Sequence, residues 1–260
     1  MHEAIRHVKT ADGDMPVEVF TPTQTGACPG IIFFMDIFGF RDELRDMCRR
    51  YAAAGYAVFL PGLFYRQGNP CFQPTSQPGD GAPAEASALN EALTTEMTAE
   101  DTANLIQQVA KLTEVLVPAF GTVGYCMGGR HAMASAARNK GDVRAAASLH
   151  GGRLINATPH SMEKLIDDME AELFFGFAKD DPTCPPDHQS IIEQALAVSS
   201  TPGRIEYFDA AHGWTFPERY CFDKPAAERA WTCVLDLFGR RLQQRANAGA
   251  VQRMPPVEAV

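Results

Sequence analysis

The chain has 260 residues, 45% of them hydrophobic, and a formal net charge of −9. This length allows a sizeable buried core, and the acidic balance argues against nucleic acid and anionic membranes as partners. No apolar run reaches the roughly 18–20 residues that a membrane span needs, and the first residues lack the apolar core of a secretory signal. We therefore expect a cytoplasmic protein.

The first part of the chain predicts strands and a helix in alternation. Apolar and polar residues alternate over 16–20, which indicates a half-exposed strand, whereas 30–35 and 56–61 are continuously apolar and predict strands buried on both faces. Between these two runs, helical periodicity over 41–54 ends at Gly55, a residue that favours the helix C-terminus.

A segment rich in Gly, Pro and Gln follows over 66–84 and predicts a loop, which we consider as a mobile cover over a site. Helical signal resumes over 85–113. The remainder keeps the alternating rhythm, with strands predicted over 119–125, 143–149, 172–178 and 204–209, and helices over 127–138, 161–168, 186–198 and 225–242.

This alternation is typical of a mostly parallel sheet with helices on both faces, which is a three-layer α/β sandwich. No linker-like stretch divides the chain into halves that could each fold alone. We therefore predict a single domain over 1–245, followed by a mobile tail over 246–260 that has no periodicity.

The cysteines do not indicate a disulfide framework or a metal centre. Their number is seven, which is odd, and no C-x-x-C pair occurs. Cys184 and His188 have ligand-like spacing, but no second pair accompanies them, so we expect no metal.

Three chemically distinctive features follow three different predicted strands. They are Cys126, the pair Asp180–Asp181, and His212. In sheets of this class the functional residues gather at the carboxyl ends of the strands. The order of nucleophile, acid and base matches that of α/β-hydrolases, with sulfur in place of oxygen.

The residues around Cys126 read Gly-Tyr-Cys-Met-Gly. A nucleophile on a sharp strand-to-helix turn needs glycine two positions before and after it, because side chains at Gly124 and Gly128 would clash. The following helix N-terminus favours thiolate over thiol, and its free N–H groups, beginning with Met127, would face an oxyanion. Without these glycines, a buried structural cysteine would be the better interpretation.

The segments GTVGYCMGG, FFGFAKDDPTCPP and FDAAHGWTFPER resemble the dienelactone hydrolase family, and the resemblance extends over roughly residues 15–240. It implies an α/β-hydrolase fold with a Cys-Asp-His triad and no cofactor. Carried over by position, Cys126 resembles the nucleophile and His212 the general base. Asp181 resembles the triad acid, with Asp180 as the alternative.

The resemblance also implies roles for residues near the thiol. The family usually has Glu at the end of an early strand close to the nucleophile, and Asp36 holds that position here. A carboxylate there would oppose thiolate formation or hydrogen-bond the resting thiol. Ile37 resembles the second oxyanion donor beside Met127.

Substrate binding is where the chain departs from the family pattern. The helical segment expected to supply one substrate-binding arginine contains none over 85–104, and Arg219 is the counterpart of the other, in a different register. This puts dienelactone itself in doubt. Arg66 is a substitute anion contact, with a surface salt bridge as the alternative, and His150 either lines the site or bonds to backbone.

The resulting hypothesis is hydrolysis of a small ester or lactone through an acyl-enzyme. One alternative is a broader carboxylesterase or thioesterase that acts on a neutral substrate. Another, of a different class, is a non-catalytic binding or thiol-sensing member of the fold. We expect a small-molecule substrate, no nucleic acid or membrane partner, and a monomer or small homo-oligomer.

Overall fold

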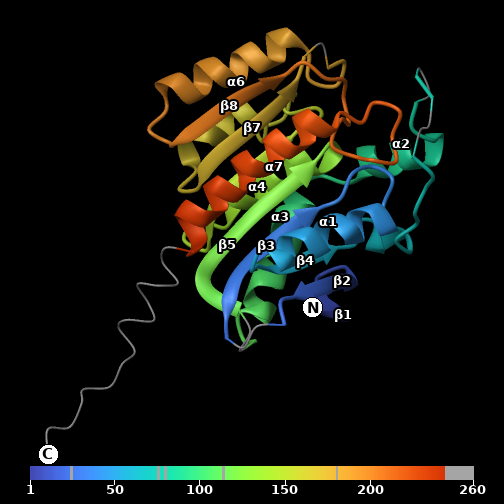
Figure 1. The fold of residues 1–260 in the computed structure, drawn as a ribbon, viewed down its shortest axis with the longest axis vertical. Helices are drawn as coiled ribbons and strands as arrows, with labels where there is room; N and C mark the ends of the chain where they lie inside the picture. The colour runs from blue at the N-terminus through green and yellow to red at the C-terminus, as the bar shows by residue number, and fades with distance from the viewer. Residues whose placement is uncertain (24–25, 75–76, 79–80, 113–114, 180, 244–260) are drawn as a thin grey trace, which may run out of the picture.

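A computed structural model describes the chain except residues 24–25, 75–76, 79–80, 113–114, 180 and 244–260. Its strands form one sheet in the order β1-β2-β4-β3-β5-β6-β7-β8 (Figure 1). The strand bounds are β1 His2–Thr10, β2 Gly13–Thr21, β3 Cys28–Phe34, β4 Ala57–Pro61, β5 Val115–Tyr125, β6 Val143–Leu149, β7 Glu172–Ala178 and β8 Gly203–Phe208.

The sheet is antiparallel only at the β1–β2 and β2–β4 pairs and parallel from β4 through β3, β5, β6 and β7 to β8. The parallel strands therefore end at one common edge, where chain segments far apart in the sequence meet. This confirms the predicted mostly parallel sheet.

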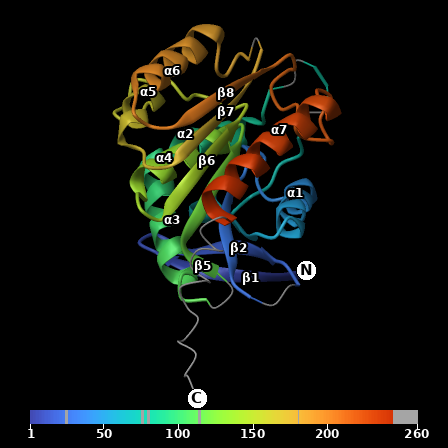
Figure 2. The same cartoon turned by 60° about the vertical axis from the view of Figure 1, so that its left-hand side comes forward.

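Helices cover both faces of the sheet, so the architecture has three layers. In Figure 1, α1 and α7 lie in front of the sheet and α3 and α4 behind it, and the turned view of Figure 2 separates the same two layers. The helix bounds are α1 Asp42–Ala53, α2 Ala84–Ala92, α3 Thr95–Val109, α4 Met127–Arg138, α5 Met162–Leu165, α6 Pro186–Val198 and α7 Lys224–Phe238.

Two predicted helices are wrong in detail, and one strand was not predicted. The helical stretch expected over 85–113 is divided, because Leu93 is extended and Thr94 begins a new helix by accepting a hydrogen bond from the N–H of Met97 at 3.2 Å. Strand β1 had no prediction, because it is an edge strand on which only Val8 is buried and it shows no clear apolar alternation. The helix expected over 225–242 ends as α7 at Phe238 and continues as one π-helical turn, Gly239–Gln243.

Aromatic packing holds the strand that leads into Cys126. The ring of Tyr125, the last residue of β5, stacks on Phe33 of β3 with centroids 5.0 Å apart. Its hydroxyl lies 2.9 Å from the hydroxyl of Tyr51 on α1. These buried contacts fix the end of β5 against the α1 layer, so the residue that follows Tyr125 has a defined position.

Candidate active site

Cys126 lies at the turn between β5 and α4, which we call the elbow (residues 124–128). Its φ of 55° is in the left-handed region, where a side chain strains the backbone. A Cβ on Gly124 would lie 2.0 Å from the carbonyl oxygen of Gly128, and a Cβ on Gly128 would lie 2.3 Å from that of Phe34. Both glycines are therefore required by close backbone approach, as the sequence predicted.

The elbow brings Cys126 to two residues from other strand ends. The sulfur of Cys126 is 3.1 Å from Nε2 of His212, in the loop after β8. Nδ1 of the same imidazole is 2.6 Å from Oδ2 of Asp181, in the loop after β7. Asp181 is buried, with 1% of its surface exposed. The alternative acid, Asp180, lies outside the described residues.

Thr183 holds the carboxylate of Asp181 in place. Both its backbone N–H and its hydroxyl donate to Oδ1 of Asp181, at 2.8 and 2.7 Å. The other carboxylate oxygen, Oδ2, is thus left to accept from the Nδ1–H of His212. This arrangement directs Nε2 of the imidazole toward the sulfur of Cys126.

The charges at this site favour a proton on His212. Burial alone would lower the pKa of His212, but the negative charge of the Cys126 sulfur and the hydrogen bond to Asp181 outweigh it and raise the pKa to about 10. At neutral pH His212 is therefore an imidazolium, held between the carboxylate of Asp181 and the sulfur of Cys126.

His150 follows β6 and bonds to the elbow, and it is not among the described residues that line the cavity of the Cys126 sulfur. The backbone N–H of Cys126 donates both to the carbonyl of Leu149 and to Nδ1 of His150, each at 3.1 Å, so this Nδ1 is unprotonated. Nε2 must then carry the hydrogen and donate to the hydroxyl of Thr215 at 2.8 Å. Burial, and the charges of His212 and Arg219, lower the pKa of His150 well below its usual range, which keeps the ring neutral.

A cavity of about 250 Å³ opens in front of the sulfur. Cys126, His212, Ile37 and Met127 all line it, so the two expected oxyanion donors are at the site. Met127 is the first residue of α4, and its N–H therefore has no acceptor within the helix. Ile37 follows β3, the strand next to β5.

Three arginines also line this cavity: Arg130, Arg153 and Arg219. The guanidinium of Arg130 donates to the side chain of Asn90 at 2.6 Å, and no carboxylate bonds to it among the described residues. Burial and the charge of Arg153 lower the pKa of Arg130 to about 10, although the Cys126 sulfur opposes this effect. Such a cavity suits an anionic group.

Sequence reasoning considered Arg219 but missed Arg130 and Arg153. The signal for Arg130 was its place directly after Gly-Tyr-Cys-Met-Gly-Gly, in the first turn of the helix that follows Cys126. Asn90, to which Arg130 bonds, belongs to α2 and lies inside the 85–104 segment that contains no arginine.

Two other expected site residues, Asp36 and Arg66, form ion pairs with neighbouring side chains. Asp36 is fully buried and binds both terminal nitrogens of Arg41, at 2.6 and 2.7 Å. Arg66 binds Asp101 and Asp12 and is not among the residues that line the cavity in the described part of the chain. Arg66 therefore forms salt bridges, which was the alternative to an anion contact in the site.

Part of the loop expected over 66–84 lies against the turn that carries Ile37. The N–H of Phe72 donates to the carbonyl of Phe38 at 2.8 Å, and Ala82 lines the cavity. A role of this loop as a cover stays a prediction. Among the described residues, no group of three or more His, Cys, Asp or Glu side chains is placed to hold a metal, and no helix there is long and apolar enough to cross a membrane.

The sheet order, the elbow and the positions of Asp181 and His212 after later strands are those of an α/β-hydrolase fold. The sequence model of the dienelactone hydrolase family matches residues 15–242. The chain therefore belongs to that family of hydrolases.

Relatives and solved structures agree with this family. A Synechocystis sp. protein named "Putative carboxymethylenebutenolidase" is 28% identical and the match covers 85% of this chain and 90% of that protein. The "Carboxymethylenebutenolidase" of Rhodococcus opacus is 26% identical over 93% of this chain and 92% of its own. The crystal structure of a "Putative Dienelactone Hydrolase" from Klebsiella pneumoniae has a TM-score of 0.81 at 22% identity and covers 92% of this chain and 98% of its own, a likeness of fold.

Proposed function

We propose that the protein hydrolyses a small ester or lactone through an acyl-enzyme on Cys126. The observation that carries this proposal is the continuous contact from the Cys126 sulfur to His212 at 3.1 Å and from His212 to Asp181 at 2.6 Å. The names of the relatives, carboxymethylenebutenolidases, support an ester or lactone bond as the target.

In the proposed first step, the thiolate of Cys126 attacks the carbonyl carbon of the substrate. The N–H groups of Ile37 and Met127 stabilise the resulting oxyanion, and the loss of one such donor typically costs about 10²–10³ in rate. His212 then donates its proton to the departing alkoxide, which leaves a thioester on Cys126 and a neutral imidazole.

In the second step, the neutral His212 takes a proton from water as the water attacks the thioester. Collapse of the tetrahedral species releases the acid and returns the thiolate and the imidazolium. Asp181 keeps Nδ1 protonated throughout and stabilises the positive charge on the ring. Both proton transfers thus use His212, which already contacts Cys126 and Asp181 in the structure.

We further propose that the substrate carries an anionic group. The absence of an arginine from 85–104 favoured a neutral substrate, but Arg130, Arg153 and Arg219 bring positive charge to the cavity from other elements. Arg130 is the strongest candidate contact, because a substrate carboxylate would pair a guanidinium that bonds only to Asn90 among the described residues. A neutral ester has no negative charge to pair with the guanidinium.

Replacement of Cys126 by Ala tests the nucleophile. We expect kcat on p-nitrophenyl esters to fall by at least about 10³ and the acyl adduct seen by intact-protein mass spectrometry to disappear. Cys71→Ala is the matched control, because Cys71 is exposed and is not among the lining residues. A Cys126→Ala variant as fast as wild type would overturn the assignment. A wild-type protein that does not turn over esters would instead favour the non-catalytic, thiol-sensing alternative.

The cytoplasmic location, the single domain and the monomeric or small homo-oligomeric state stay predictions from the sequence. Sedimentation of the purified chain and limited proteolysis test the last two directly.

A further inference from the structure

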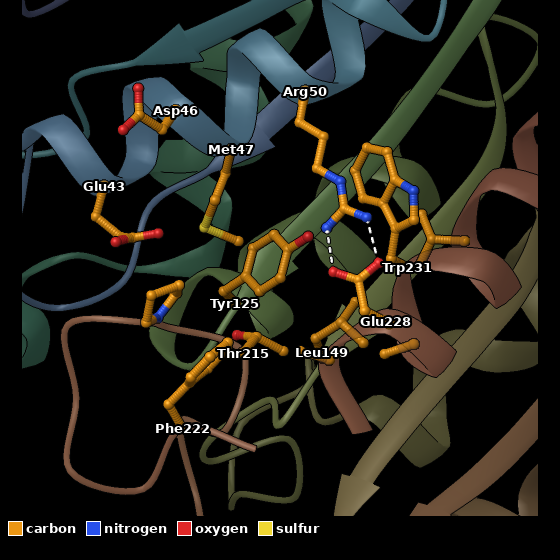
Figure 3. Close-up of a pocket in the computed structure, with 14 residues that line it drawn as sticks. Glu43, Asp46, Met47, Arg50, Tyr125, Leu149, Thr215, Phe222, Glu228 and Trp231 are labelled. Atoms are coloured by element: carbon orange, nitrogen blue, oxygen red, sulfur yellow. Dashed lines mark hydrogen bonds and ion pairs between the residues drawn. The ribbon is translucent and has the colours of Figure 1, made fainter. Parts of the chain in front are cut away.

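A second cavity, of about 190 Å³, lies between α1 and α7 (Figure 3). It is separate from the cavity that the Cys126 sulfur lines, and its walls include Tyr125, which belongs to the elbow, and Thr215, which hydrogen-bonds His150. Its lining is mostly apolar, with Met47, Tyr125, Leu149, Phe222, Trp231 and Val234 among the contributors.

The charged groups at this cavity are unequal in how they are paired. Arg50 binds both carboxylate oxygens of Glu228, at 3.0 and 2.5 Å, and lies 4.0 Å over the ring of Trp231. These two charges cancel. Asp46 accepts a hydrogen bond from Arg49 at 2.6 Å. Glu43 has no hydrogen bond or ion pair with any described residue, although its side chain is half-buried and lines the cavity.

The surroundings of Glu43 disfavour its charged form. Burial and the negative charge of Glu218 raise the pKa of Glu43 to about 7. Arg41 is close enough to act in the opposite direction, but its guanidinium is bound to Asp36 and Glu218. A positive charge brought into the cavity would therefore pair a carboxylate that the protein itself leaves unpaired.

We propose that the cavity between α1 and α7 is a binding site for a small organic cation, an ammonium group on an aromatic or branched apolar body. The ammonium pairs with Glu43, and the apolar body packs on Tyr125, Trp231 and Phe222. Aromatic walls suit such a ligand, because their faces attract cations as well as apolar groups.

The two cavities then have opposite preferences for charge. Arginines line the cavity in front of Cys126, whereas the only unpaired charged side chain that lines the second cavity, within the described residues, is the carboxylate of Glu43. Thr215 lines the second cavity and also accepts the hydrogen bond from His150, the residue that holds the N–H of Cys126. An occupant of the second cavity would thus touch a residue that positions the elbow.

Calorimetric titration of the full chain with benzylammonium and benzyl alcohol tests the site. We expect benzylammonium to bind at least fivefold more tightly than its neutral isostere, benzyl alcohol. Glu43→Gln should weaken benzylammonium by about fivefold, the usual upper range for a partly exposed ion pair, and leave benzyl alcohol unchanged. Asp42→Asn is the matched control, because Asp42 lies on the same helix and is 90% exposed.

The pH dependence gives a second readout. The charged and titratable groups near Glu43 are Arg41, Asp46 and Arg50 on the α1 side and Glu218 and Glu228 on the α7 side. Because the cation needs the charged carboxylate, its affinity should rise between pH 6 and pH 8 in wild type and stay flat in Glu43→Gln. Ala227→Phe, which fills the cavity from α7, should abolish binding of both benzyl compounds.

Three results would overturn the proposal: equal affinity for benzylammonium and benzyl alcohol, unchanged cation affinity in Glu43→Gln, or unchanged affinity in a folded Ala227→Phe variant. Circular dichroism of each variant establishes folding before titration. The test does not depend on ester hydrolysis, so it remains decisive whether or not the proposed function holds.

Discussion

Replacement of Gly128 by Ala tests whether the elbow depends on close backbone contact. The new Cβ would lie 2.3 Å from the carbonyl oxygen of Phe34 and 2.6 Å from that of Met35. Both are backbone atoms of the segment that leads to Ile37, so neither can rotate away. The clash must displace α4 from the end of β3, which separates the two expected oxyanion donors.

The magnitude follows from two opposing effects. Overpacking of a tightly packed interior typically costs 1–3 kcal/mol or more, and two backbone contacts below 3.0 Å place Gly128→Ala at the upper end. Alanine is preferred over glycine inside a helix by about 1 kcal/mol. We therefore expect a net loss of about 2 kcal/mol, which lowers the Tm by roughly 4–8 °C in a chain of this size.

Thermal unfolding followed by circular dichroism, together with ester hydrolysis, measures both consequences. Gly239→Ala is the matched control, because Gly239 has helical dihedral angles and a Cβ there meets nothing within 4 Å. We expect it to raise the Tm by a few degrees and to leave activity intact. A Gly128→Ala protein with wild-type Tm and activity would refute the argument from backbone approach.

Three further predictions concern the site and the pH range of stability. Thr183→Val removes the hydroxyl that holds Asp181 and should lower kcat by about tenfold while KM changes little. Arg130→Gln should raise KM for a p-nitrophenyl hydrogen succinate by about tenfold and leave p-nitrophenyl butyrate unaffected. The pKa of buried His131 and of His150 is well below the usual range of histidine, chiefly because of burial. At these two side chains the unfolded chain binds more protons below about pH 6.5, so their contribution to the free energy of unfolding should fall from pH 7 to pH 5, whereas the raised pKa values of Glu43 and His212 act in the opposite direction.

Each of these has a control or a contradicting outcome. Thr183→Ser keeps the hydroxyl and should restore most of kcat. An equal loss on both esters in Arg130→Gln would mean that Arg130 supports the fold of the cavity rather than anion binding. Urea unfolding at pH 5 and pH 7 measures the third prediction, and His131→Leu should reduce the pH dependence. The same pH dependence in wild type and in His131→Leu would contradict the neutral state of the His131 ring.

Much of the fold could be predicted because its signals are local. The strands over 30–35 and 56–61 are continuous apolar runs, and the structure buries both faces of β3 and β4. Strand β1 could not be predicted in the same way, because an exposed edge strand needs no apolar pattern. The break between α2 and α3 depended on the single cap at Thr94, which the periodicity of 85–113 concealed.

The sequence by itself determined that a cysteine flanked by two glycines would end a strand, with an acid and a histidine after later strands. Only the tertiary structure decided what surrounds these groups. Asp36 pairs with Arg41, His150 bonds to the N–H of Cys126, and Arg130 lines the cavity. The physical reason is that the elbow follows from steric demands among neighbours in the chain. The partners of a buried charge depend instead on which strands and helices the sheet order places side by side.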